Sequence, residues 1–152
     1  MDRNVLIVLS GIPASGKSTY GEKIKASNKN MTIVCPDEIR EELYGNASIQ
    51  GDNEEVFGKV HTHLYFTGYE RRNAIFDATN LTAKKRKEWV KRERPYYDTI
   101  VCHYFRPNLE KSIEQNEMRE RKVPKEVIRR MYHQWEEPTT AEGFDYVAEI
   151  KY

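Results

Sequence analysis

Residues 11–19 of the chain read GIPASGKST, and they directly follow the apolar run VLIVL and Ser10. The stretch satisfies the pattern GxxxxGK[ST] at every fixed position, from Gly11 through Gly16 and Lys17 to Ser18. A strand is predicted before it and a helix after it, so successive backbone N–H groups and the positive end of the helix should face one anion. The stretch therefore predicts binding of a nucleoside triphosphate, ATP in the simplest case, together with Mg²⁺.

Each fixed position of this loop has a physical role. Gly11 and Gly16 let the backbone approach the phosphates closely, Lys17 can reach the β- and γ-phosphates, and the Ser18 hydroxyl can ligate Mg²⁺. The predicted ATP-binding residues of the loop are Gly11, Ile12, Pro13, Ala14, Ser15, Gly16, Lys17, Ser18 and Thr19.

Composition limits the possible classes of protein. With 152 residues we expect a single domain over 1–152, and 25 Lys and Arg against 24 Asp and Glu leave no global field toward nucleic acid or membrane. No apolar run approaches a membrane span, so we expect a cytoplasmic protein, in the host cytoplasm if phage-encoded. Cys35 and Cys102 lie in apolar runs, which favours buried thiols in a reducing compartment.

Short β-rich runs alternate with longer charged stretches of helical periodicity, which is typical of βαβ units around a parallel sheet. We predict a three-layer α/β/α fold with a mainly parallel sheet of four to five strands. The predicted strands are Val5 to Leu9, Met31 to Cys35, Ala74 to Asp77, Thr99 to Phe105 and Tyr146 to Ile150. The predicted helices are Lys17 to Ser27, Asp37 to Tyr44, Glu54 to Arg72, Ala83 to Arg94, Leu109 to Arg121 and Lys125 to Glu136.

Several predicted helices carry start signals. Asp52 and Glu55 have the spacing of a capping box, and Asn108 precedes the helix that begins at Leu109. Pro124 stands where a first helical turn tolerates proline.

The second predicted strand runs into the residues PDEIR at positions 36–40. Ligands of open parallel sheets lie at the carboxyl ends of the strands, so Asp37 is expected near the phosphate-binding loop. There it could accept a proton from an attacking hydroxyl, with Arg40 one helical turn away on the same face. A base beside a cation suits a substrate that has both a hydroxyl and an anionic group, although Asp37 could equally be an ordinary N-cap.

The third predicted strand ends in the residues DATN at positions 77–80. An apolar strand that ends in Asp77 is typical of the carboxylate placed near the metal in P-loop enzymes. Asp77 and Asn80 could also simply end a strand and build a turn, and both readings are compatible.

Two stretches late in the chain are strongly basic. Residues 116–124, NEMRERKVP, place Arg119 and Arg121 between two predicted helices, where a mobile lid could close over a transferring group. The alternative is a solvated helix end. Residues 84–94 carry seven cations and two anions; Trp89 and Val90 mark the buried side, and we favour a solvated face over a groove-lining helix.

In their order and spacing, GIPASGKST, DEIR, DATN and NEMRERKVP resemble the phage-type polynucleotide 5′-hydroxyl kinases, over nearly the whole chain. The resemblance implies a P-loop kinase fold with a helical lid over residues 115–124. It also implies that Asp37 is the general base for the acceptor 5′-OH and that Arg40 holds the neighbouring phosphate. Arg119 would contact the donor phosphates. Asp77, with Thr79 and Asn80 of the same element, would support the P-loop and the metal.

This chain departs from the family pattern in the lid. Gln115 stands where a second lid arginine is expected, the segment that follows is shorter, and Arg121 is the residue that could substitute. Some relatives also phosphorylate other hydroxyls, such as a hydroxymethylated base in DNA.

We therefore predict transfer of the γ-phosphate of ATP to a 5′-hydroxyl end of DNA or RNA. The alternatives are a kinase of another hydroxyl, on a modified base, nucleoside or small metabolite, and a nucleotide-dependent switch without transfer.

Overall fold

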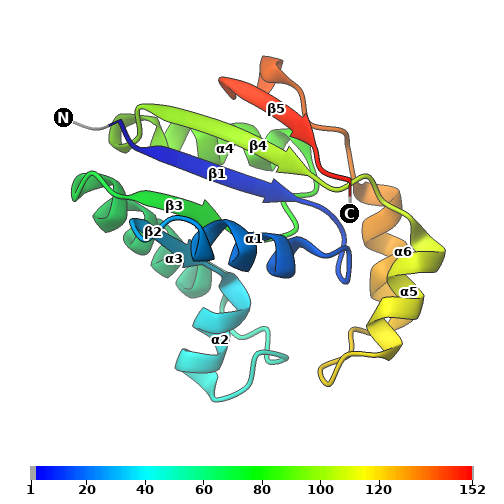
Figure 1. Cartoon of the computed structure of the whole chain (residues 1–152). Coiled ribbons are helices and arrows are strands. Elements are labelled where there is room, and N and C mark those ends of the chain that lie inside the picture. The colour runs from blue at the N-terminus through cyan, green and yellow to red at the C-terminus, as the bar shows by residue number, and fades with distance from the viewer. Residues whose placement is uncertain (1–2, 152) are drawn as a thin grey trace.

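Five parallel strands form the central layer of the structure, a computed structural model that describes residues 3–151, in the order β2-β3-β1-β4-β5. Helix α1 covers one face of this sheet, and α3 and α4 cover the other (Figure 1). The elements in chain order are β1 (Val5–Ser10), α1 (Lys17–Ala26), β2 (Met31–Val34), α2 (Pro36–Tyr44), α3 (Asn53–Tyr69), β3 (Asn73–Phe76), α4 (Ala83–Glu93), η1 (Arg94–Tyr96), β4 (Thr99–Tyr104), α5 (Leu109–Glu117), α6 (Lys125–Gln134), η2 (Thr140–Glu142) and β5 (Tyr146–Glu149). The predicted three-layer parallel α/β fold is confirmed.

The strand period of two explains the layers, because successive side chains of a buried strand point to opposite faces. Leu6 and Val8 of β1 join the core cluster that includes α3 and α4 residues. Ile7 and Leu9 join the smaller cluster, which is packed against Ile24 of α1 and other partly buried residues. An all-apolar β1 is therefore what a strand covered by helices on both sides requires.

The order of the strands decides where the site lies. β1 is the central strand; the chain builds β2 and β3 on one side of it and β4 and β5 on the other. Ligands of such sheets bind at the carboxyl end of the strand where the direction of winding reverses, which here is β1. Helices α5 and α6 stand beside this end of the sheet, and α2 stands across from them (Figure 1).

Each predicted strand differs from the observed one by one residue at one or both ends, whereas two helices end three or four residues earlier than predicted. Helix α5 ends at Glu117 and not at Arg121, because the Asn116 side chain bonds both the N–H and the carbonyl of Val123 and turns the chain back. Helix α3 ends at Tyr69 and not at Arg72, since Arg71 adopts a left-handed φ of 62°.

The predicted start signals held in part. Asn108 caps α5 by accepting from the Lys111 N–H, as expected. Only one of the two hydrogen bonds of the predicted capping box forms. The Asp52 carboxylate accepts from the first turn of α3, but Glu55 accepts from the Tyr44 hydroxyl and not from the Asp52 N–H. Pro124 lies one residue before α6 and not inside its first turn. Within residues 3–151, no helix combines the length and apolarity that crossing a bilayer requires.

Candidate active site

The loop at residues 11–16 joins β1 to α1 through two left-handed positions, Ala14 with φ 60° and Gly16 with φ 95°. At Gly11 the constraint is close packing, because a Cβ there would lie 3.0 Å from the Ser15 Oγ and 3.2 Å from the Phe105 Cβ. Gly16 occupies the N-cap position of α1 and has no side chain to bond the first-turn amides. Those amides are therefore available to an anion, as the sequence predicts.

Lys17 is buried inside this loop. Its ammonium donates to the Ile12 carbonyl at 3.0 Å and to the Ser15 Oγ at 3.4 Å. Burial lowers the pKa of Lys17, the charge of Asp77 opposes that shift, and the charge of Arg119 adds to it. Among the residues that the structure describes, the Lys17 ammonium bonds only neutral acceptors. A buried cation of this kind gains most from a bound anion, so Lys17 is suited to hold a phosphate.

Ser18 and Asp77 meet at the mouth of the loop. The Ser18 hydroxyl donates to the Asp77 Oδ2 at 2.8 Å, and the Asp77 N–H donates to the Val34 carbonyl at 2.9 Å. A hydroxyl beside a carboxylate is the donor set that fits Mg²⁺ shared with substrate phosphates. The structure thus joins two residues that the sequence assigned separately to the metal and to its support.

Thr79 and Asn80 tie the P-loop to the end of β3. The Thr79 carbonyl accepts from the Gly11 N–H at 3.0 Å. Asn80, at a φ of 41°, donates to the Leu9 carbonyl at 2.7 Å, and its own carbonyl accepts from the Ser10 hydroxyl at 2.8 Å. These hydrogen bonds hold Leu9, Ser10 and Gly11, at the start of the P-loop, against the segment that follows β3.

Asp37 lies in the first turn of α2, because Pro36 opens that helix directly after the extended Cys35. The Asp37 Oδ1 accepts from Arg40 at 3.0 Å, and its Oδ2 accepts from Arg121 at 2.7 Å. Arg40 is itself buried and has further contacts with Asn53 and with the face of the Phe57 ring. Asp37 and Arg40 therefore lie together as the sequence predicts, with a second arginine added from the loop between α5 and α6.

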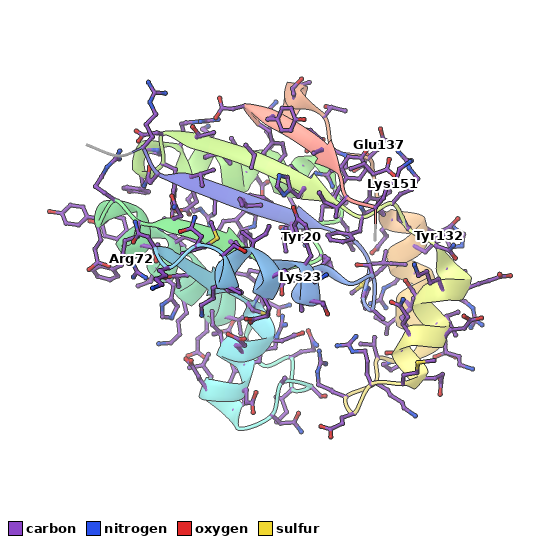
Figure 2. All side chains as sticks on the ribbon, viewed as in Figure 1. Tyr20, Lys23, Arg72, Tyr132, Glu137 and Lys151 are labelled. Atoms are coloured by element: carbon purple, nitrogen blue, oxygen red, sulfur yellow. The ribbon has the colours of Figure 1, made fainter. Side chains whose placement is uncertain are left out.

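Most of the predicted P-loop, acceptor, support and lid residues line one open cleft of about 730 Å³, whereas Gly11, Ile12 and Asn80 are not among the residues that line it. Figure 2 shows side chains of α2 and of the α5–α6 connection projecting toward each other across it. The cleft is lined by residues 13–19 of the P-loop, by Asp37 and Arg40, by Asp77 and Thr79, and by Arg119 and Arg121. Its remaining wall is partly apolar and includes Phe57, Val127 and Met131.

A smaller cavity of about 240 Å³ also borders the P-loop. Ala14, Ser15 and Gln115 line both spaces. Phe105, Arg106 and Glu149 are among the residues that line only the smaller one. The P-loop therefore borders two spaces, and only the larger one is also lined by Asp37.

Cys35 corrects one expectation, since it is only partly buried and lines the cleft. Burial raises the pKa of its thiol to about 11, so the thiol stays protonated at neutral pH. Cys102 is buried in the core as predicted, with a pKa raised to about 12 by the same cause.

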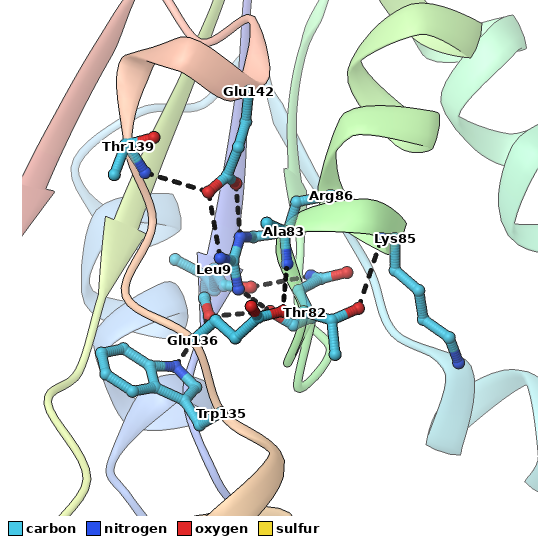
Figure 3. Close-up of polar contacts among 11 residues, drawn as sticks. Leu9, Thr82, Ala83, Lys85, Arg86, Trp135, Glu136, Thr139 and Glu142 are labelled. Atoms are coloured by element: carbon cyan, nitrogen blue, oxygen red, sulfur yellow. Dashed lines mark hydrogen bonds and ion pairs between the residues drawn. The ribbon is translucent and has the colours of Figure 1, made fainter.

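A buried polar network behind the P-loop was missed from the sequence (Figure 3). Arg86, which is 0% exposed, bonds both carboxylate oxygens of Glu142 and donates to the Asn80 carbonyl at 2.8 Å. Trp135, which follows α6, donates to the Ser10 Oγ at 3.1 Å. The network links α4, η2, the residue that follows α6 and the end of β1 just before the P-loop.

The prediction of a solvated face for residues 84–94 was thus wrong for Arg86, although Lys84, Lys85 and Lys87 are exposed and Trp89 and Val90 are buried. The signal was present in the spacing, because Arg86 stands three and four residues before Trp89 and Val90 and so shares their face. Because residues 84–94 carry seven cations and two anions, the sequence favoured exposure for all of the charged side chains, including Arg86.

We expect Arg86→Met to lower the free energy of unfolding by about 3–5 kcal/mol, since it leaves Glu142 buried without its partner. Urea unfolding followed by circular dichroism measures this change, with Lys87→Met as the exposed control on the same helix. The double variant Arg86→Met, Glu142→Leu should recover much of the loss, because no unpaired charge remains. A single variant within about 1 kcal/mol of wild type would contradict a structural role for the pair.

A P-loop after the central strand, a carboxylate at each of two neighbouring strand ends and a helical lid together define a P-loop kinase fold. Residues 6–138 match the family model AAA_33, which is described as an AAA domain, and the chain belongs to this family. The chain is also 28% identical over 146 residues to an L-seryl-tRNA(Sec) kinase of Methanococcus maripaludis (strain DSM 14266), a match that covers 93% of this chain and 56% of that protein. It therefore spans a little over half the length of this curated relative.

Several solved structures share the fold. A chain in the structure of the Pnkp1/Rnl/Hen1 RNA repair complex matches with a TM-score of 0.80 at 24% identity, over 95% of this chain and 47% of that one. Chaetomium thermophilum Kti12, in complex with ADP-AlF3, matches with a TM-score of 0.73 at 16% identity, over 97% of this chain and 89% of Kti12. At these identities the likeness concerns the fold.

Proposed function

We propose that this protein transfers the γ-phosphoryl group of ATP to a 5′-hydroxyl end of DNA or RNA. The observation that carries the proposal is the Asp37–Arg40 pair, 3.0 Å apart, in the same cleft as the P-loop. A nucleotide-dependent switch needs a residue that positions water, whereas a carboxylate beside a cation suits an acceptor with a hydroxyl and an anion. Membership of a P-loop kinase family supports the transfer step.

On the donor side, the first-turn amides of α1 and the Lys17 ammonium would hold the phosphates, with Arg119 approaching from the lid. The smaller cavity beside the P-loop would take the base and ribose of the nucleotide. Ser18 and Asp77 would hold Mg²⁺, which supplies neutralisation of phosphate charge when bound. Because Lys17 is buried, water would screen its charge less, and its attraction for the group being transferred would be stronger.

On the acceptor side, Asp37 would accept the proton of the attacking hydroxyl while Arg40 holds the neighbouring phosphate. The acceptor oxygen forms a bond to the γ-phosphorus, the bond from that phosphorus to the β–γ bridging oxygen breaks, and ADP leaves. Positioning is the main contribution of the protein, because the phosphoryl transition state needs an in-line approach more than covalent help.

A second candidate acceptor is the hydroxyl of a serine esterified to tRNA. The 28% identity to a seryl-tRNA(Sec) kinase, over most of this chain, is the observation that favours it. This acceptor also pairs a hydroxyl with nearby phosphates, so the Asp37–Arg40 pair suits it as well. The apolar wall of Phe57, Val127 and Met131 could contact a base or a sugar in either case.

The deciding experiment supplies γ-labelled ATP and Mg²⁺ with a 5′-OH oligonucleotide, seryl-tRNA, a panel of nucleosides and water alone. We expect label on the 5′ end of the oligonucleotide. Label on the seryl group would replace the proposal with the second candidate. Label only in nucleosides or in inorganic phosphate would contradict both.

We expect Arg40→Ala to raise the KM for the oligonucleotide much more than the KM for ATP, because Arg40 lies on the acceptor side of the cleft. Losing a charge-assisted contact should cost about 10- to 100-fold in acceptor kcat/KM. Steady-state kinetics with each substrate varied in turn measures the split. Arg129→Ala, which removes an exposed cation from α6, is the control. A larger rise in the KM for ATP would remove Arg40 from the acceptor site.

A further inference from the structure

The two lid arginines meet opposite sides of the cleft. Arg119 lowers the pKa of Lys17 through its charge, which places it within electrostatic reach of the P-loop. Arg121 instead donates from Nη2 to the Asp37 Oδ2 at 2.7 Å, across 84 residues of sequence. Both arginines lie in the loop that Asn116 and Val123 close. The Asn116 Nδ2 donates to the Val123 carbonyl at 2.7 Å, and the Val123 N–H donates to the Asn116 Oδ1 at 2.9 Å.

Because of Arg121, both oxygens of the proposed base are occupied. Arg40 holds the Asp37 Oδ1 and Arg121 holds the Oδ2. Two of the roughly four lone-pair positions of the carboxylate are then taken by cations, one on each oxygen. Departure of one arginine would return a position to the hydroxyl and remove a charge that competes for the same oxygen.

Arg121 is the partner that is free to move. The Arg40 side chain is only 10% exposed and is also held by Asn53 and Phe57. The Arg121 side chain is 34% exposed and lies in the loop between α5 and α6, and Asp37 is its one ion-pair partner among the residues that the structure describes. A partly exposed ion pair of this kind is weak enough for a competing anion to replace.

We propose that Arg121 is a specificity residue for the acceptor: it leaves Asp37 to bind an anionic group carried next to the acceptor hydroxyl, and thereby frees the base. This inference rests on the proposed function. Together with Arg40, Arg121 forms a pair of guanidinium groups on either side of Asp37, which suits a phosphodiester with its two free oxygens. The acceptor class is thus a hydroxyl one phosphodiester away from the rest of a chain.

The same exchange discriminates against water. Water brings no anion to the acceptor side, so Arg121 stays on Asp37, and a carboxylate paired with two guanidinium groups activates water less well. A neutral hydroxyl compound lacks the anion in the same way. The pair between Arg121 and Asp37 therefore couples activation of the base to arrival of the correct acceptor, which limits hydrolysis of ATP in its absence.

The test compares two 5′-OH DNA oligonucleotides that differ only at the first internucleotide linkage, a phosphodiester in one and an uncharged methylphosphonate in the other. For the wild type, kcat/KM should favour the phosphodiester by about 10- to 100-fold, the size expected for charge-assisted hydrogen bonds. In Arg121→Ala this preference should fall about tenfold, with the KM for ATP unchanged. Hydrolysis of ATP without an acceptor should rise in the same variant.

Three further variants make the comparison specific. Arg119→Ala should raise the KM for ATP and keep the preference for the phosphodiester, Lys125→Ala should change neither, and Arg121→Lys should restore part of the preference. An Arg121→Ala enzyme that keeps the full preference, or that raises the KM for ATP as Arg119→Ala does, would overturn the inference and make Arg121 a donor residue. Unchanged hydrolysis of ATP would overturn its role in guarding the base.

The outcomes also separate this inference from the proposed function. If the wild type phosphorylates both oligonucleotides equally well, the proposed function stands and the anion requirement fails. If it phosphorylates neither, the polynucleotide acceptor is wrong, and the role of Arg121 fails with it.

Discussion

Asp37→Asn is expected to slow phosphoryl transfer to a 5′-hydroxyl by about 10²- to 10⁴-fold, the range that a positioned general base contributes. Asparagine keeps the size and shape of the side chain but cannot take up the hydroxyl proton. ATP binding should persist, because the P-loop, Lys17 and Arg119 are untouched. Single-turnover rates measure the transfer step, and the ATP-induced rise in melting temperature reports binding separately.

Glu38→Gln provides the matched control for this substitution. Glu38 is the neighbouring carboxylate in the first turn of α2, and it is not among the residues that line the cleft. Its replacement should leave the transfer rate close to that of the wild type. Should Asp37→Asn keep more than about a tenth of the wild-type rate, the carboxylate is not the base and its part in the mechanism has to be abandoned.

Lys17→Met is expected to reduce kcat/KM for ATP by about 10²- to 10³-fold, as removal of one preorganised donor to developing charge typically does. The variant should also lose most of its stabilisation by ATP, which for the wild type is worth about 2.7 kcal/mol at a ligand concentration 100 times the Kd. Without ATP, the variant should be as stable as the wild type or more stable, since methionine carries no buried charge. Thermal unfolding with and without ATP measures both effects.

The direction of the Lys17 pKa adds a pH test. Burial lowers this pKa, so the folded protein loses the proton at a lower pH than the unfolded chain does. The ligand-free wild type should gain stability as the pH rises through the folded pKa toward the ordinary lysine value, while ATP affinity should fall over the same range. Lys17→Met should show neither trend, and Lys23→Met, an exposed lysine on the same helix, should behave as wild type. Undiminished stabilisation of Lys17→Met by ATP would exclude a phosphate-binding role.

The fold was predictable because its signals are local. An all-apolar β1 can be buried on both faces only between two layers of helices, and the glycines of the P-loop mark the left-handed or closely packed positions where its backbone turns. Asp37 and Asp77 follow β2 and β3, and they could be assigned to one edge of the sheet because the carboxyl ends of parallel strands meet there. The end of α5 could not be predicted, since it depends on the Asn116 side chain reaching Val123.

The sequence by itself determined the P-loop, the parallel sheet and the carboxylates at the strand ends, because backbone conformation and hydrophobic period are properties of neighbouring residues. Only the tertiary structure decided the partners of the charged groups. Arg86 is buried against Glu142, 56 residues later, and Arg121 reaches Asp37 from the lid. An ion pair depends on distance in space, and neither its partner nor its burial is contained in the spacing of the residues around it. That is why Arg121 was predicted with the donor phosphates and is observed in an ion pair with Asp37.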